Sequence, residues 1–256
     1  MSSSFHQLPR QIALDLGCAP KASLGNFIAT GNENLLEVLT EIKQSLPQSL
    51  QTGAPKTALK AEQRMIHIWG ESGSGRSHIL EAMKLLATDL NQASWMLGHD
   101  SSDDDWREAG LVISENPQSF ALLCVDDVDS LDEFAQGALF RIHNLIRESS
   151  SQVLLTSSKV PPTNLDLRDD LRTRLAWGLV FKMHALSDDE KLNALEQAAQ
   201  ARGLQLSPDV PPWLLRHFHR DMSSLMSLIE ALDTYSLETK RAVTLPLVKE
   251  LLALKN

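Results

Sequence analysis

The stretch Gly70-Glu71-Ser72-Gly73-Ser74-Gly75-Arg76-Ser77 decides the fold of this chain. It follows the apolar run Met65–Trp69, and the residues after it, Ser77–Asn91, have apolar side chains at helical spacing. Strand, glycine-rich loop and helix in this order match the phosphate-binding pattern G-x-x-x-x-G-[KR]-[ST]. Glycines let successive backbone N–H groups turn toward phosphate oxygens, and the helix adds its positive N-terminal end. The stretch therefore predicts a nucleotide phosphate site.

From this pattern we expect contacts to the phosphates of ADP or ATP from Gly70, Ser72, Gly73, Ser74, Gly75, Arg76, Ser77 and His78. The hydroxyl of Ser77 would also hold Mg²⁺. Position 76 carries arginine where most such loops carry lysine, and a forked guanidinium is bulkier than the compact ammonium. Nucleotide binding survives this change more easily than hydrolysis does. The alternative is a glycine-rich turn without a ligand.

A second pattern is the apolar run Ala121–Val125, which ends in the acids Asp126 and Asp127. In a buried parallel strand, such acids are delivered to the ligand crevice at the carboxyl end of the sheet. We expect Asp126 to join Ser77 at the Mg²⁺ ion and Asp127 to orient the attacking water as a catalytic residue. Taken alone, the two acids also fit a simple cap of a strand.

The remaining pattern predicts an α/β unit followed by a helical one. Further strands are predicted at Leu111–Ile113, Phe120–Val125 and Val153–Thr156, and helices at Asn34–Ile42 and Leu139–Arg147. Alternating strands and helices indicate a parallel sheet with helices on both faces. After Ala185 only helices are predicted, at Asp188–Arg202, Pro211–His217, Met222–Glu238 and Leu245–Leu254, with Ser187 as an N-cap.

Composition excludes several classes of protein. The apolar fraction is 43% and the charged fraction 22%, as in ordinary globular proteins. A net charge of −9 argues against a broad DNA-gripping surface, which needs clustered lysine and arginine. Two distant cysteines, Cys18 and Cys124, indicate neither a disulfide framework nor a zinc site. No apolar run is long enough for a membrane span and no secretory signal is present, so we expect a cytoplasmic protein.

Five segments carry a family resemblance. They are GESGSGRSH, LLCVDD, LLTSSKVPP, LRTRLAWG and HRDMSSL, and they follow one another as in the DnaA initiator family of AAA+ proteins. The similarity runs from Phe27 to the C-terminus, and Arg76 resembles the Hda branch of this family more than DnaA itself. The resemblance implies an α/β fold, a P-loop AAA+ parallel sheet flanked by helices, with a small C-terminal all-helical lid. We divide the chain into a flexible tail (1–24), the nucleotide-binding domain (25–184) and the lid (185–256).

The resemblance also implies further site residues. Phe27, Ile28, Gly31 and Asn32 would line the adenine pocket, although a plain loop remains an alternative for this segment. Arg174 matches the arginine finger that reaches a nucleotide on a neighbouring subunit, with Arg172 as the other candidate and an ordinary surface arginine as the alternative for either.

Two more positions belong to the sensors of the family. Arg220 matches the second sensor, which projects from the lid onto the phosphates. Ser158 takes the place of the first sensor, where the family usually has an acid, and it carries no charge. Like Arg76, this departure weakens the expectation of self-catalysed hydrolysis.

The tail contains Gln11, Ile12, Leu14 and Leu16 in the pattern Q-x-x-L-x-L, which resembles peptides that dock on the bacterial sliding clamp. Two leucines of a flexible peptide fit an apolar groove while the glutamine satisfies polar groups at its rim. The chain ends after the lid, where the DnaA family has a DNA-reading module, so we expect no sequence-specific DNA binding.

Together these features predict a regulator of replication initiation in the bacterial cytoplasm, associated with the nucleoid through the clamp. Its expected partners are the DnaA initiator and the β sliding clamp of DNA polymerase III, and no membrane. Hydrolysis of ATP would then occur mainly on the initiator, assisted by Arg174. Two alternatives stay open: a self-contained ATPase resembling the helicase loaders, and a clamp-bound adaptor without enzymatic effect. Self-association into a homo-oligomer is also left open.

Overall fold

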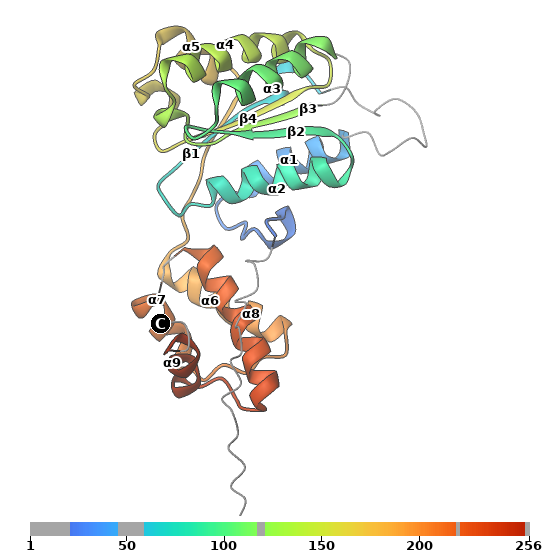
Figure 1. Ribbon diagram of the computed structural model, residues 1–256. Coiled ribbons are helices and arrows are strands. Elements are labelled where there is room, and N and C mark those ends of the chain that lie inside the picture. The colour runs from blue at the N-terminus through green and yellow to red at the C-terminus, as the bar shows by residue number, and fades with distance from the viewer. Residues whose placement is uncertain (1–20, 46–58, 117–120, 219–220, 254–256) are drawn as a thin grey trace, which may run out of the picture. The chain divides into compact units, whose positions relative to one another are not determined.

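The computed structural model describes residues 21–45, 59–116, 121–218 and 221–253, and these form two compact units. One unit covers Ala22–Leu186, and the other contains the residues from Ser187 onward. The first is an α/β layer structure and the second is helical (Figure 1).

A parallel sheet forms the centre of the first unit. Its strands are β1 (Met65–Trp69), β2 (Ala93–Leu97), β3 (Ala121–Val125), β4 (Val153–Ser158) and β5 (Leu179–Lys182). Their spatial order is β2-β3-β4-β1-β5, and each neighbouring pair is parallel. Every residue of β3 and β4 is buried, as expected for central strands covered on both faces. The carboxyl ends of β1, β3 and β4 therefore meet at one edge.

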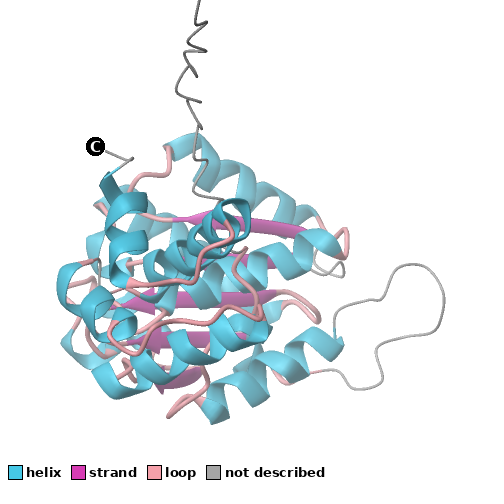
Figure 2. Ribbon diagram, turned by 90° about the horizontal axis from the view of Figure 1, so that it is seen from below, coloured by secondary structure: helices cyan, strands magenta, loops and turns pink. Residues whose placement is uncertain are grey.

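Helices cover both faces of this sheet, as Figure 1 shows. The helices are α1 (Glu33–Ser45), α2 (Arg76–Asp89), α3 (Asp103–Glu115), α4 (Glu133–Glu148) and α5 (Asp169–Leu175). One apolar core includes Leu39 and Ile79, from α1 and α2, and the other includes Trp106 and Leu139, from α3 and α4. Figure 2, seen from below, shows the strands side by side and partly hidden by helices.

In its described residues, the second unit has four helices around its own core. They are α6 (Asp188–Ala201), α7 (Val210–His217), α8 (Met222–Thr239) and α9 (Leu245–Ala253). Their fully buried side chains include Leu195, Leu214 and Leu247. As predicted, Ser187 caps α6: its hydroxyl accepts from the backbone N–H of Glu190, whose side chain accepts from the N–H of Ser187.

The predicted fold class is confirmed, but one predicted strand is wrong. Leu111–Ile113 lies in α3, which begins with a capping box between Ser102 and Asp105 and buries Trp106, Ala109 and Ile113 on one side. The apolar triplet is thus the end of an amphipathic helix. The sequence analysis also missed β2 and β5, the two edge strands of the sheet, where several side chains are only half-buried. No helix in the described ranges has the length and apolar character needed to span a membrane.

Candidate nucleotide-binding site

The glycine-rich loop leaves β1 at Trp69 and enters α2 at Arg76. Gly73 and Gly75 have φ angles of +81° and +91°, a region that glycine occupies without strain. A side chain at Gly70 would lie 2.8 Å from the carbonyl oxygen of Met183, so only glycine fits there. The backbone therefore curls tightly at the carboxyl edge of the sheet, where parallel α/β folds bind their ligands.

This loop fits a phosphate group. The buried hydroxyl of Ser74 has no hydrogen-bond partner among the described residues. The first N–H groups of α2 have no acceptor within the helix, and a Cβ built at Gly73 meets no atom within 4 Å. Unused donors beside open space at a helix N-terminus are the features of an anion site.

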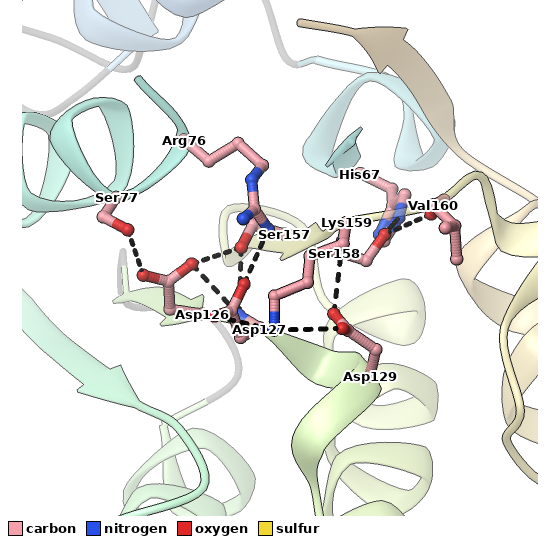
Figure 3. Close-up of polar contacts among 10 residues, drawn as sticks. All are labelled: His67, Arg76, Ser77, Asp126, Asp127, Asp129, Ser157, Ser158, Lys159 and Val160. Atoms are coloured by element: carbon pink, nitrogen blue, oxygen red, sulfur yellow. Dashed lines mark hydrogen bonds and ion pairs between the residues drawn. The ribbon is translucent and has the colours of Figure 1, made fainter. Parts of the chain in front are cut away.

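The two acids after β3 lie next to this loop (Figure 3). The hydroxyl of Ser77 donates to Asp126, with 2.6 Å between Oγ and Oδ2. A second hydroxyl, from Ser157 of β4, donates to the other oxygen of Asp126. Hydroxyl and carboxylate oxygens are the ligands that Mg²⁺ prefers, so the pair Ser77 and Asp126 fits this ion.

The neighbouring acid, Asp127, lies between two cations. Its Oδ1 is 2.6 Å from Nη1 of Arg76, and its Oδ2 is 3.8 Å from Nζ of Lys159 (Figure 3). Lys159 also lies 3.6 Å from Asp129. The backbone of Asp127 has a φ of +44°, and its N–H donates to Ser157 Oγ at 3.0 Å. Sequence reasoning gave Arg76 and Asp127 separate roles and did not predict that they pair.

The serine of β4 that reaches the acids is Ser157, whereas Ser158, the residue at the place of the first sensor, contacts His67 instead. Neighbouring side chains of a strand point to opposite faces of the sheet. Ser158 is fully buried on the face opposite to that of Ser157. There it lies 2.8 Å from Nε2 of His67 and donates to the carbonyl of Val160. Burial, and to a smaller extent the charge of Arg76, lower the pKa of His67 to about 3.

The segment predicted to line the adenine pocket lies against the loop. A Cβ at Gly75 would be 2.7 Å from Cε2 of Phe27, whose ring is 5.8 Å from that of His78. The side chain of Asn32 binds both the N–H of His184, at 2.9 Å, and its carbonyl, at 3.2 Å. These contacts hold Phe27 and Asn32 beside the sheet edge.

Two other members of the segment have less specific surroundings. Gly31 has a φ of +74°, and a Cβ there would lie 3.2 Å from Cβ of His184, so the turn at this position favours glycine. Ile28 is half-buried.

A cleft of about 520 Å³ opens beside Asp126 and Asp127. Besides these acids and Ser77, it is lined by Glu81 and by the turn Gly98–Ser101 that follows β2. This turn is not among the predicted site residues, because β2, the strand that leads into it, was not predicted. The cleft provides space for a ligand next to the Ser77 and Asp126 oxygens.

Comparison with known families identifies both units. The model described as "Hda, lid domain" matches residues 188–252, and that of the bacterial DnaA ATPase domain matches residues 105–182. The chain is an AAA+ protein of the DnaA family.

Solved structures agree with this fold for the DnaA-family chain. Domain III of the replication initiation protein DnaA from Thermotoga maritima is 19% identical, with a TM-score of 0.63 over 93% of this chain and 98% of that one. AMPPCP-bound DnaA from Aquifex aeolicus is 23% identical, with a TM-score of 0.61 over 86% and 68%. The RuvB Holliday junction branch migration motor of Thermotoga maritima is 14% identical, with a TM-score of 0.57 over 92% and 72%.

In this DnaA-family chain the two candidate finger arginines differ in their surroundings. Arg172 pairs with Asp169 at 2.6 Å, one turn earlier in α5. Arg174 forms no ion pair with any described residue, and its guanidinium carbon lies 5.7 Å from the ring centre of Phe140. Its backbone carbonyl is 3.1 Å from Nε2 of the buried His143. The backbone of Arg174 is therefore held in place, while its guanidinium forms no ion pair with a described residue.

The remaining predicted residues of the DnaA-family chain lie outside the described residues. They are Arg220 in the lid and the clamp-like residues Gln11, Ile12, Leu14 and Leu16.

Proposed function

We propose that this DnaA-family protein regulates the initiation of chromosomal replication by stimulating ATP hydrolysis on the DnaA initiator. The observation that carries the proposal is the difference between the two arginines of α5. Arg172 uses its charge within the helix, whereas Arg174 keeps its charge for a partner. An arginine supplied by one subunit stabilises the charge that develops on the phosphates held by another.

The protein itself would bind ADP or ATP with Mg²⁺. Support comes from the curled loop Gly70–Gly75, the unpartnered Ser74 hydroxyl and the contact between Ser77 and Asp126. The DnaA structure from Aquifex aeolicus carries the nucleotide analogue AMPPCP. When bound, the metal would supply charge neutralisation for the phosphates, while Ser77 and Asp126 hold it and the loop amides orient the chain of phosphates.

Other parts of the proposal follow from the resemblance alone. The tail pattern at Gln11, Leu14 and Leu16 would dock on the β sliding clamp, which places the protein at the nucleoid of a bacterial cytoplasm. Arg220 would contact the phosphates from the lid. Phe27 and Asn32 would border the adenine base.

The test mixes the protein with DNA-loaded clamp and ATP-bound DnaA, and measures conversion of the initiator's labelled ATP to ADP. We expect the wild-type protein to accelerate this conversion, Arg174→Ala to lose at least a hundredfold, and Arg172→Ala to stay within about threefold. No acceleration by the wild-type protein defeats the proposal. Equal losses in both arginine variants would remove Arg174 as the finger.

Two further measurements test the clamp-binding tail and the alternative of a self-contained ATPase. The double variant Leu14→Ala and Leu16→Ala should abolish stimulation on the clamp, because it removes both apolar anchors of the tail. Phosphate release by the protein alone, without DnaA, tests the self-contained ATPase. Sustained turnover that Asp127→Asn abolishes would favour that alternative.

A further inference from the structure

Arg76 and Asp127 form an ion pair that connects the glycine-rich loop with the acids after β3. The distance from Nη1 to Oδ1 is 2.6 Å, and 8% of the Arg76 side chain and 33% of the Asp127 side chain are exposed. An ion pair shielded from water is held more firmly than one on the surface, where solvent and salt screen the charges. The carboxylate of Asp127 is therefore fixed to the guanidinium.

This pairing affects the chemistry expected of Asp127. In ATP hydrolysis a water oxygen bonds to the terminal phosphorus as the bond from that phosphorus to the bridging oxygen breaks, and a proton of the water passes to a base. Asp127 can receive this proton only through a free oxygen lone pair. Nη1 of Arg76 takes up one lone pair of Oδ1, and Nζ of Lys159 lies 3.8 Å from Oδ2, so both oxygens face a cation. The two cations hold the carboxylate in this orientation, so that it is not free to turn toward the attacking water.

The forked guanidinium of arginine can bind a carboxylate and a phosphate at the same time, which the single ammonium of lysine does less well. Nη1 of Arg76 binds Asp127, and its other donors form no hydrogen bond with the described residues. A guanidinium presents five N–H donors in a plane, so one edge can bind the carboxylate while the other binds phosphate oxygens. The single nitrogen of lysine has no second edge, and phosphate would draw it away from the acid.

We propose that Arg76 suppresses hydrolysis of the nucleotide bound by this chain, by holding Asp127 and the phosphates at the same time. The inference rests on the nucleotide site of the proposed function. Its consequence is a protein that retains ATP or ADP without consuming it, so that the nucleotide acts as a structural ligand. Lys159 contributes less than Arg76, since its side chain is 51% exposed and its charge is shared with Asp129.

The experiment measures single-turnover ATP hydrolysis by the full-length protein at saturating ATP, together with the Kd for ATP. The variants are Arg76→Lys, Arg76→Lys with Asp127→Asn, and Arg107→Lys as a matched control. Arg107 pairs with Asp103 and Asp104 on the surface of α3. We expect Arg76→Lys to hydrolyse ATP at least tenfold faster than the wild type, the double variant to return to the wild-type rate, and Arg107→Lys to match the wild type.

A second measurement compares Arg76→Lys with the double variant. If Arg76 restrains Asp127, the acid acts only once Arg76 is replaced, so the double variant should hydrolyse ATP at least tenfold more slowly than Arg76→Lys. Equal rates in these two proteins overturn the inference, because they show that Asp127 is not the group that Arg76 restrains. So does an Arg76→Lys protein that binds ATP with wild-type affinity and hydrolyses it no faster. Stimulation of DnaA, measured on the initiator's own ATP, reports on the proposed function separately.

Discussion

Nε2 of His143 lies 3.1 Å from the backbone carbonyl oxygen of Arg174, so a residue of α4 fixes the last turn of α5. The imidazole is buried, and burial together with the charge of Arg174 lowers its pKa to about 4. A neutral ring has one N–H, which Nε2 donates to the carbonyl. The unpartnered Nδ1 is consistent with this tautomer.

His143→Leu should therefore weaken the function of Arg174 without touching its side chain. The variant removes the side-chain donor to the Arg174 carbonyl, which still accepts from the N–H of Trp177 at 3.1 Å, and we expect a loss of about 1 kcal/mol in the free energy of unfolding. Stimulation of DnaA should fall at least tenfold at a temperature where the variant is fully folded, because the finger loses its position. His143→Gln, which keeps a donor, should recover part of the stimulation. Full stimulation by His143→Leu would contradict the positioning role.

Gly75→Ala should weaken nucleotide binding at least tenfold. The position has a φ of +91°, which costs an L-residue about 1–2 kcal/mol, and the new methyl would lie 2.7 Å from the Phe27 ring. Gly203→Ala is the matched control, since Gly203 has a φ of +70° and nothing within 4 Å of a Cβ. That variant should lose stability by a similar backbone cost and keep its affinity. Calorimetric titration with ADP measures the affinity of both variants. Equal affinities of Gly75→Ala and Gly203→Ala for ADP would refute the steric argument.

Arg64→Ala should destabilise the α/β unit by about 3 kcal/mol. The side chain is 4% exposed and donates to the carbonyls of Ile146, Ser149 and Gln152, where α4 ends. Its removal takes a donor from each of these carbonyls, of which that of Ile146 also accepts from the N–H and the hydroxyl of Ser149. Arg202→Ala, which breaks a more exposed pair with Glu230, should cost less than about 1 kcal/mol. Guanidinium unfolding measures both variants, and similar costs for the two would contradict this ranking.

Stability should fall as pH drops from 7 toward 4. Burial lowers the pKa of His67 from 6.5 to about 3, so below pH 6.5 the unfolded chain takes up a proton that the folded chain does not. At pH 5 this linkage amounts to about 2 kcal/mol, and it is absent above pH 6.5, where both states are neutral. His67→Gln should lose this part of the pH dependence, whereas the exposed His99→Gln should keep it. Unfolding curves at pH 7 and pH 5 test the difference.

Much of the fold was predictable because the central strands are continuous apolar runs. β1 has the predicted bounds, and β3 and β4 differ from the predictions only at their ends. The edge strands β2 and β5 were missed because half-buried strands carry a weaker pattern. Because β2 was not predicted, the predicted strand at Leu111–Ile113 stood in its place between the helix after the loop and the next strand. The structure assigns that segment to α3.

The sequence by itself determined the nucleotide loop, the acids after β3 and the family, because glycine spacing and local periodicity encode strand, turn and helix over short distances. Only the tertiary structure decided which of Ser157 and Ser158 reaches Asp126, since the pleat of β4 turns neighbouring side chains to opposite faces. It alone paired Arg76 with Asp127 and placed Arg174 beside His143, without an ion pair to any residue that the structure describes. These relationships join residues distant in sequence, and the packing of α2, α4 and α5 on the sheet brings them into contact.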